Sequence, residues 1–144
     1  MRPATLAEAV DRICAGEPQD IVLAELVDTF LMAPDAAARY ATIESEPRRV
    51  NDKKLDALVG AVAEYLAKHY DLPHVPPWAG ASWRRLDEPW FTSSSNSPGM
   101  LEYLSYASPA EFRSRNIFTE ERPLRRARSH RPFAAKAPLP TGAE

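Results

Sequence analysis

Apolar residues recur at helical spacing in the middle of the chain, within the stretch from Asn51 to Trp78. Five aliphatic side chains follow one another at intervals of three and four residues: Leu55, Leu58, Val59, Val62 and Leu66. This spacing places them along one side of a helix that faces the protein core. Asn51 is suited to cap the helix, and the prolines that begin at Pro73 prevent its continuation. The pattern therefore predicts a central helix near residues 52–70.

Gly60 lies inside this predicted helix. Glycine in a helix interior costs about 1 kcal/mol relative to alanine. The absence of a side chain lets another segment come close to the backbone at this position. We therefore expect a second helix to approach the central helix at Gly60.

Three shorter amphipathic segments precede the central helix and predict helices near residues 5–15, 18–32 and 35–45. Thr5 and Glu8 have the spacing of a capping box at the start of the first. Prolines at positions 18 and 34 suit the first turns of the other two. Four helices joined by short turns are typical of a compact antiparallel bundle.

The segment after Tyr70 has neither helical nor strand periodicity. Three tryptophans fall within thirteen residues and are separated by prolines and glycine. This composition indicates an ordered, aromatic, proline-rich coil. Its rings either cover one end of the bundle or form an aromatic surface for a ligand or partner. The candidate residues for such a surface are Trp78, Trp83, Trp90 and Phe91.

Shorter helical patterns return near the C-terminus and predict helices near residues 98–107, 109–115 and 120–128. Ser97, Ser108 and Thr119 stand where N-caps are expected, and Ser108 has Glu111 at capping-box spacing. From Ser129 onward the chain has no periodicity and little hydrophobicity, which predicts a disordered tail over 129–144. The predicted fold is therefore all-α, a single helical domain over residues 1–128 followed by this tail.

Composition limits the class of protein. A chain of 144 residues with 44% hydrophobic residues can form one domain with a modest core. No apolar run approaches the length of a membrane span, and acidic residues occupy the place of a signal-peptide core. The single cysteine, Cys14, has no partner for an internal disulfide. We therefore expect a cytoplasmic protein without a membrane partner.

Catalytic and metal-binding patterns are missing from the sequence. The three histidines, His69, His74 and His130, lack the spacing of a metal site, and no nucleophile or phosphate-loop motif occurs. We therefore predict no catalytic residues, no metal, no cofactor and no enzymatic activity.

Charge divides the chain into an acidic body and a basic end. Residues 1–112 carry 10 Lys and Arg against 17 Asp and Glu, whereas residues 113–144 carry 8 against 3. If the predicted last helix forms, Arg122, Arg125 and Arg126 share one face of it. The planar guanidinium group of arginine can bind a carboxylate or a phosphate group through two parallel hydrogen bonds. The candidate partner-binding residues are Arg113, Arg115, Phe118, Arg122, Arg125, Arg126 and Arg128.

Three sequence segments carry a resemblance to a known group: LDALVGAVAEYLAKHYDLPHVPPW, LDEPWF, and SPAEFRSRNIF followed by RPLRRAR. Together they resemble a group of small, mostly uncharacterised bacterial helical proteins, some encoded beside a nucleotidyltransferase-like protein. The resemblance implies an antitoxin-like role, with a toxin-like or nucleotidyltransferase-like enzyme as the partner. It also implies that Phe112, Ile117 and Phe118 dock the C-terminal segment.

Our leading hypothesis is a non-enzymatic protein-interaction module that binds a protein partner through its basic C-terminal third. The alternative from another class is a nucleic-acid-binding regulator that uses the same arginines on phosphates. A third hypothesis places a small-ligand pocket in the segment from Trp78 to Trp90.

Overall fold

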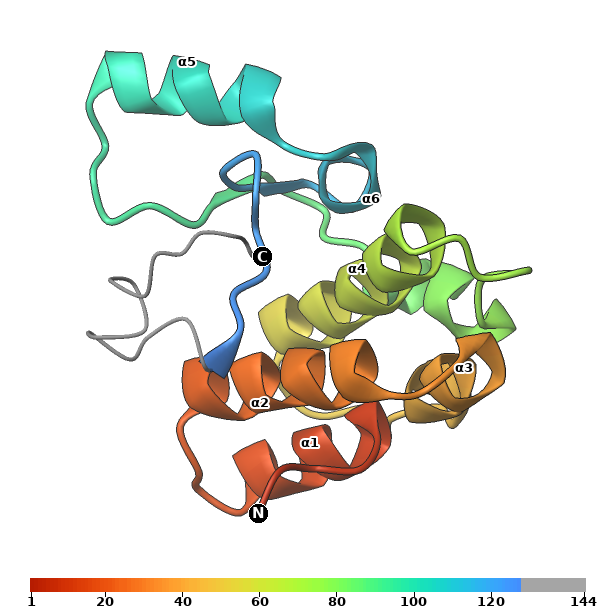
Figure 1. Ribbon diagram of the computed structural model, residues 1–144. Helices are drawn as coiled ribbons and strands as arrows, with labels where there is room; N and C mark the ends of the chain where they lie inside the picture. The colour runs from red at the N-terminus through yellow and green to blue at the C-terminus, as the bar shows by residue number, and fades with distance from the viewer. Residues whose placement is uncertain (128–144) are drawn as a thin grey trace, which may run out of the picture.

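The computed structural model describes residues 1–127 of the chain. Within this range lie six α-helices, two 3-10 turns and one two-stranded sheet, which confirms the predicted all-α class (Figure 1). The helices are α1 (Leu6–Cys14), α2 (Gln19–Met32), α3 (Ala36–Glu44), α4 (Lys53–His69), α5 (Pro98–Ala107) and α6 (Ala110–Arg113). The remaining elements are η1 (Pro77–Gly80), η2 (Ser82–Arg84), β1 (Trp90–Phe91) and β2 (Ile117–Phe118).

The central position of α4 is confirmed, because α4 packs against η1, η2 and α6 as well as the first helices. Its aliphatic stripe is buried, and Leu58 at its edge is partly buried. The cap differs from the prediction. Asp52 rather than Asn51 accepts a hydrogen bond from the backbone N–H of Leu55, at 3.1 Å. A carboxylate is the stronger acceptor at this end of a helix because the helix dipole favours negative charge there.

The first three helices lie within two residues of their predicted bounds. Thr5 accepts a hydrogen bond from the N–H of Glu8, and the Glu8 carboxylate accepts one from Ala4 N–H. Asp35 caps α3 in the same manner through the N–H of Ala38. Figure 1 shows α1 beside α2, with α4 on the opposite side of α2. The apolar faces of these helices meet in one core cluster that includes Leu26.

The aromatic segment is more regular than predicted. Instead of coil alone, it forms η1, η2 and the short strand β1. The indole N–H of Trp78 donates to the carbonyls of Ile43 and Glu44, at 3.1 and 3.0 Å, and the ring is buried. Trp78 therefore closes the junction between α3 and α4, as the interpretation of a cover over one end of the bundle expected.

A parallel pair of two-residue strands, which the sequence did not predict, joins this segment to the C-terminal region. Trp90 pairs with Ile117, and Phe91 pairs with Phe118. Trp90 and Ile117 line one groove with α2 and α4, so their face of the sheet is turned toward the bundle. Side chains alternate along a strand, so Phe91 and Phe118 lie on the other face, where their rings stack at 5.0 Å. Figure 1 shows the strands between α5 and the bundle.

The predicted C-terminal helices are confirmed only in part. Ser97 caps α5 as expected, through the N–H of Met100. Ser108 does not cap α6; its hydroxyl accepts from Thr119 N–H at 2.8 Å and lies within hydrogen-bonding distance of the Leu104 and Thr119 carbonyls. Ser108 therefore ties the end of α5 to the residue after β2.

The predicted helix near residues 120–128 is wrong. Residues 119–126 contain no helix, and we call residues 119–127 the strap. Pro123 explains the difference, because it lacks an N–H donor and disfavours the helical conformation of the residue before it. Leu124 packs against the core cluster instead. The predicted tail over 129–144 lies outside the described residues.

Within residues 1–127, no helix is both long enough and apolar enough to cross a membrane.

Candidate functional site

The arginines predicted to form one partner-binding surface differ in how deeply the structure buries them. Arg115 is buried, Arg126 is partly buried, and Arg113, Arg122 and Arg125 are exposed. Arg128 lies outside the described residues. The exposed arginines do not share a helix face, because the strap that carries Arg122 and Arg125 is not helical. The charged stripe expected from the sequence is therefore absent from the described part of the chain.

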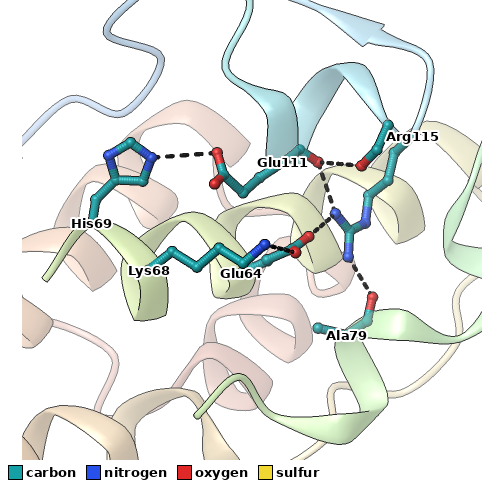
Figure 2. A network of polar contacts seen from close by, with 7 residues as sticks. Glu64, Lys68, His69, Ala79, Glu111 and Arg115 are labelled. Carbon is teal, nitrogen blue, oxygen red and sulfur yellow. Dashed lines mark hydrogen bonds and ion pairs between the residues drawn. The ribbon is translucent and has the colours of Figure 1, made fainter. Parts of the chain in front are cut away.

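Arg115 lies in a polar network between α4 and α6 rather than on the surface (Figure 2). One nitrogen, Nη1, lies 2.6 Å from Oε1 of Glu64 and donates to the carbonyl of Glu111 at 2.7 Å. The other, Nη2, donates to the carbonyl of Ala79 at 2.6 Å. With 5% of its side chain exposed, Arg115 ties α6 to α4 and η1.

Glu64 is the acidic member of this network. Burial by itself would raise the pKa of the Glu64 carboxyl, but hydrogen bonds from Lys68 and Arg115 outweigh it, so this pKa lies below its ordinary value. Lys68 contacts the second carboxylate oxygen at 2.7 Å. Nε2 of His69 lies 3.3 Å from Oε1 of Glu111 at the edge of the same network. The network therefore holds the carboxylate of Glu64 ionised between two cations.

A second buried arginine, Arg84, was not singled out by the sequence. It donates to the carbonyls of Asp56 and Pro47 at 3.1 and 2.8 Å. Its guanidinium lies over the rings of Trp78 and Trp83, at 4.8 and 4.1 Å. Burial lowers the pKa of Arg84, and the nearby carboxylates of Asp56 and Glu46 oppose that effect. The tryptophans therefore enclose a structural cation.

Gly60 explains how two arginines fit beside one helix. A Cβ atom on Gly60 would lie 3.1 Å from Nε of Arg115, 3.2 Å from Cδ of Arg84 and 3.2 Å from the carbonyl of Ala79. The expected close approach at Gly60 is present, but it is made by two arginine side chains and the backbone of η1. The prediction of another helix at this position is wrong.

The four aromatic residues predicted as a surface occupy different environments. Trp78 is buried, whereas Trp83, Trp90 and Phe91 are partly exposed. The Lys54 ammonium group lies over the Trp90 ring, 5.2 Å from its centre. Trp90 also lines a groove of about 590 Å³ together with residues of α2, α4 and the strap. Phe91 stacks on Phe118, the one aromatic member of the predicted partner-binding set. The four residues thus do not converge on one pocket.

The helix α5 carries the aromatic side chains with the highest exposed fractions among the described residues. Tyr103 is 48% exposed and Tyr106 is 80% exposed, whereas Leu104 on the opposite side is buried. Gly99 and Ala107 lie on the same face as the tyrosines, around a shallow hollow. Figure 1 shows α5 standing apart from the four-helix bundle. Sequence periodicity did not reveal this face, because α5 is apolar nearly all round.

A second hollow contains arginines from distant parts of the chain. It has a volume of about 560 Å³ and lies between α2, α3, the end of α4 and the strap. Its polar lining consists of Arg39, Tyr65, Tyr70, Arg122 and Arg126. Sequence reasoning identified Arg122 and Arg126 but not Arg39, which lies more than 80 positions away.

No group of three or more His, Cys, Asp or Glu residues in the range 1–127 is arranged to hold a metal ion. The chain matches no family model, no curated protein and no solved structure at a level that would show a relationship.

Proposed function

We propose that this chain is a non-enzymatic protein-interaction module that binds a protein partner through its C-terminal third. The observation that carries the proposal is the exposed tyrosine face of α5. Tyrosine is enriched at the centres of protein interfaces, because it combines a large apolar ring with a hydroxyl group. A helix with two exposed tyrosines and one buried leucine is suited to bind another protein.

Two charged residues, Arg113 and Glu102, lie near the exposed tyrosines of α5. Arg113, in the last turn of α6, is exposed, although its Nη1 donates to the carbonyl of Ser108. Glu102, also on α5, lines the same hollow as the tyrosines. A partner with apolar residues and an acidic group facing Arg113 fits this arrangement. The sequence resemblance implies a toxin-like or nucleotidyltransferase-like enzyme as that partner.

A comparison of partner capture in the native organism tests the proposal. The tagged full-length chain is compared with the double variant Tyr103→Ser/Tyr106→Ser and with Ile21→Ser, a matched control that removes an exposed apolar side chain from α2. Proteins captured by the parent chain are identified, purified and titrated. We expect the double variant to lose the partner and Ile21→Ser to retain it. Equal retention by both variants would show that α5 is not the binding surface.

The alternative is a nucleic-acid-binding regulator that uses the same arginines on phosphates. A last helix was predicted to place Arg122, Arg125 and Arg126 on one face. That helix does not form, and two of these arginines contact acidic residues of the same chain. Arg125 lies 3.3 Å from Glu120, and Arg126 lies 2.7 Å from Asp28. Titration with duplex DNA and RNA at several salt concentrations tests it, since binding through phosphates weakens steeply as salt rises.

A further inference from the structure

The hollow between α2, α3, α4 and the strap, called here the basic hollow, combines positive charge with an apolar floor. Its charged residues are Arg39 from α3 and Arg122 and Arg126 from the strap, and no acidic residue lines it. Leu31, Leu66 and Leu124 are among the apolar residues of its floor. Arg39 belongs to the acidic body of residues 1–112, whereas Arg122 and Arg126 come from the basic end of the chain.

One of the three positive charges is offset within the protein. Nε of Arg126 lies 2.7 Å from Oδ1 of Asp28, whose side chain is 2% exposed. This ion pair fixes the strap over α2 and holds Arg126 at the edge of the basic hollow. The charges of Arg39 and Arg122 are not offset by any acidic residue that lines the hollow. Counting the residues that line it together with Asp28, the basic hollow therefore has a surplus of about two positive charges.

Arg39 is held in place by its surroundings. Nη2 donates to the carbonyl of Leu31 at 3.1 Å, and the guanidinium lies 5.5 Å from the ring of Phe30 and 5.7 Å from the ring of Tyr70. Its buried Nε–H has no acceptor among residues 1–127. A guanidinium that is oriented before binding loses less conformational entropy when it meets an anion.

Two phenol groups complete the polar lining. Burial raises the pKa of Tyr65, the neighbouring Tyr70 and Glu111 add to this effect, and the positive charge of Arg122 opposes it. Tyr65 is therefore a neutral hydroxyl at pH 7, which is able to donate a hydrogen bond. Arg122, although exposed, lines the same hollow as Tyr65.

We infer that the basic hollow binds a phosphate monoester of a small apolar or aromatic alcohol. A phosphate monoester carries about −1.5 to −2 charges at pH 7 and three acceptor oxygens, which matches two surplus cations and several donors. The ester body lies against Leu31 and Leu124. The hollow, at about 560 Å³, has room for such a body beside the phosphoryl group. This site is separate from the tyrosine face of α5 and does not depend on a protein partner.

Titration of the full-length chain with phenyl phosphate tests the inference. Binding is followed by nuclear magnetic resonance of backbone amides and arginine Nε–H groups, with inorganic phosphate, phenol and benzoate as comparison ligands. We expect saturable shifts at Arg39 and in the strap with phenyl phosphate, weaker shifts with inorganic phosphate, and none with phenol. Benzoate binding as tight as that of phenyl phosphate would overturn the choice of a phosphate ester.

Arg122→Gln and Arg125→Gln form a matched pair for the same titration. Both arginines are exposed on the strap, but Arg125 lines the other groove, where it contacts Glu120. We expect Arg122→Gln to weaken phenyl phosphate binding about tenfold or more, as the loss of a charge-assisted hydrogen bond predicts. We expect Arg125→Gln to bind as the parent chain does. An equal loss in both variants, or the absence of saturable binding by the parent chain, would overturn the inference.

Discussion

A methyl group on Gly60 would lie 3.1 Å from Nε of Arg115, a nitrogen that is buried against α4. The same methyl would also meet Ala79 and Arg84 at 3.2 Å. Alanine favours a helix by about 1 kcal/mol over glycine, but overpacking costs about 1–3 kcal/mol. We expect Gly60→Ala to lower the free energy of unfolding by about 0–2 kcal/mol, as measured by urea denaturation.

Gly99 in α5 provides the control for this substitution. A Cβ atom on Gly99 would meet no heavy atom within 4 Å. Gly99→Ala is therefore expected to leave the free energy of unfolding unchanged or to raise it by less than about 1 kcal/mol. If Gly60→Ala is as stable as Gly99→Ala, the contact with the two arginines does not limit packing at this position.

Arg84 and its exposed neighbour Arg85 provide a second comparison. Arg84 is buried, donates to two backbone carbonyls and lies close to the rings of Trp78 and Trp83. We expect Arg84→Ala to cost about 3–5 kcal/mol, because it leaves a cavity and removes a charged donor from two backbone carbonyls. Arg85→Ala is expected to change stability by less than about 0.5 kcal/mol. Thermal unfolding followed by tryptophan fluorescence measures both, and similar melting temperatures would contradict the assigned role of Arg84.

The sequence allowed prediction of those elements that depend on local spacing. The predicted central helix near 52–70 agrees with α4, and the capping box at Thr5 and Glu8 agrees with the start of α1. Both depend on residues within one or two helical turns of each other. The strap shows the limit of this reasoning, although Pro123 was a local signal against the helix that was predicted there.

The buried arginines depend on contacts that sequence spacing does not reveal. Arg84 is 28 positions from Asp56, and Arg115 is 51 positions from Glu64. Arginine is seldom fully buried, so a pattern-based interpretation assigns Arg115 to the surface. Sequence spacing does not reveal the basic hollow for the same reason. Arg39 and the strap lie together only when α2, α3 and α4 are packed.

The ion pairs of Glu64 predict how stability changes in acid. Because the folded protein lowers the pKa of Glu64, the contribution of this carboxylate is fully present above its unfolded pKa of about 4.3. That contribution is lost as the pH falls through the lower folded value. We expect Glu64→Gln to unfold with a smaller pH dependence below about pH 4.3 than the parent chain.

At pH 7, Glu64→Gln is expected to be less stable by about 1.5–3 kcal/mol, the range for a hydrogen bond to a charged group. Glu120→Gln is the control, because its ion pair with Arg125 is exposed on both sides and such pairs contribute about 0–1 kcal/mol. Urea denaturation at a series of pH values measures both variants. Parallel pH profiles for the parent chain and Glu64→Gln would contradict the lowered pKa.

Substitution of an exposed tyrosine of α5 is expected to weaken partner binding without lowering the free energy of unfolding. Tyr106 is 80% exposed, so Tyr106→Ser is expected to change the free energy of unfolding by less than about 0.5 kcal/mol. Leu104→Ala, on the buried side of the same helix, is expected to cost about 2–3 kcal/mol. At the centre of an interface a tyrosine contributes about 2 kcal/mol or more, which corresponds to roughly a thirtyfold weaker affinity. Calorimetric titration of the purified partner measures this change, and an unchanged affinity for Tyr106→Ser would place the partner elsewhere on the chain.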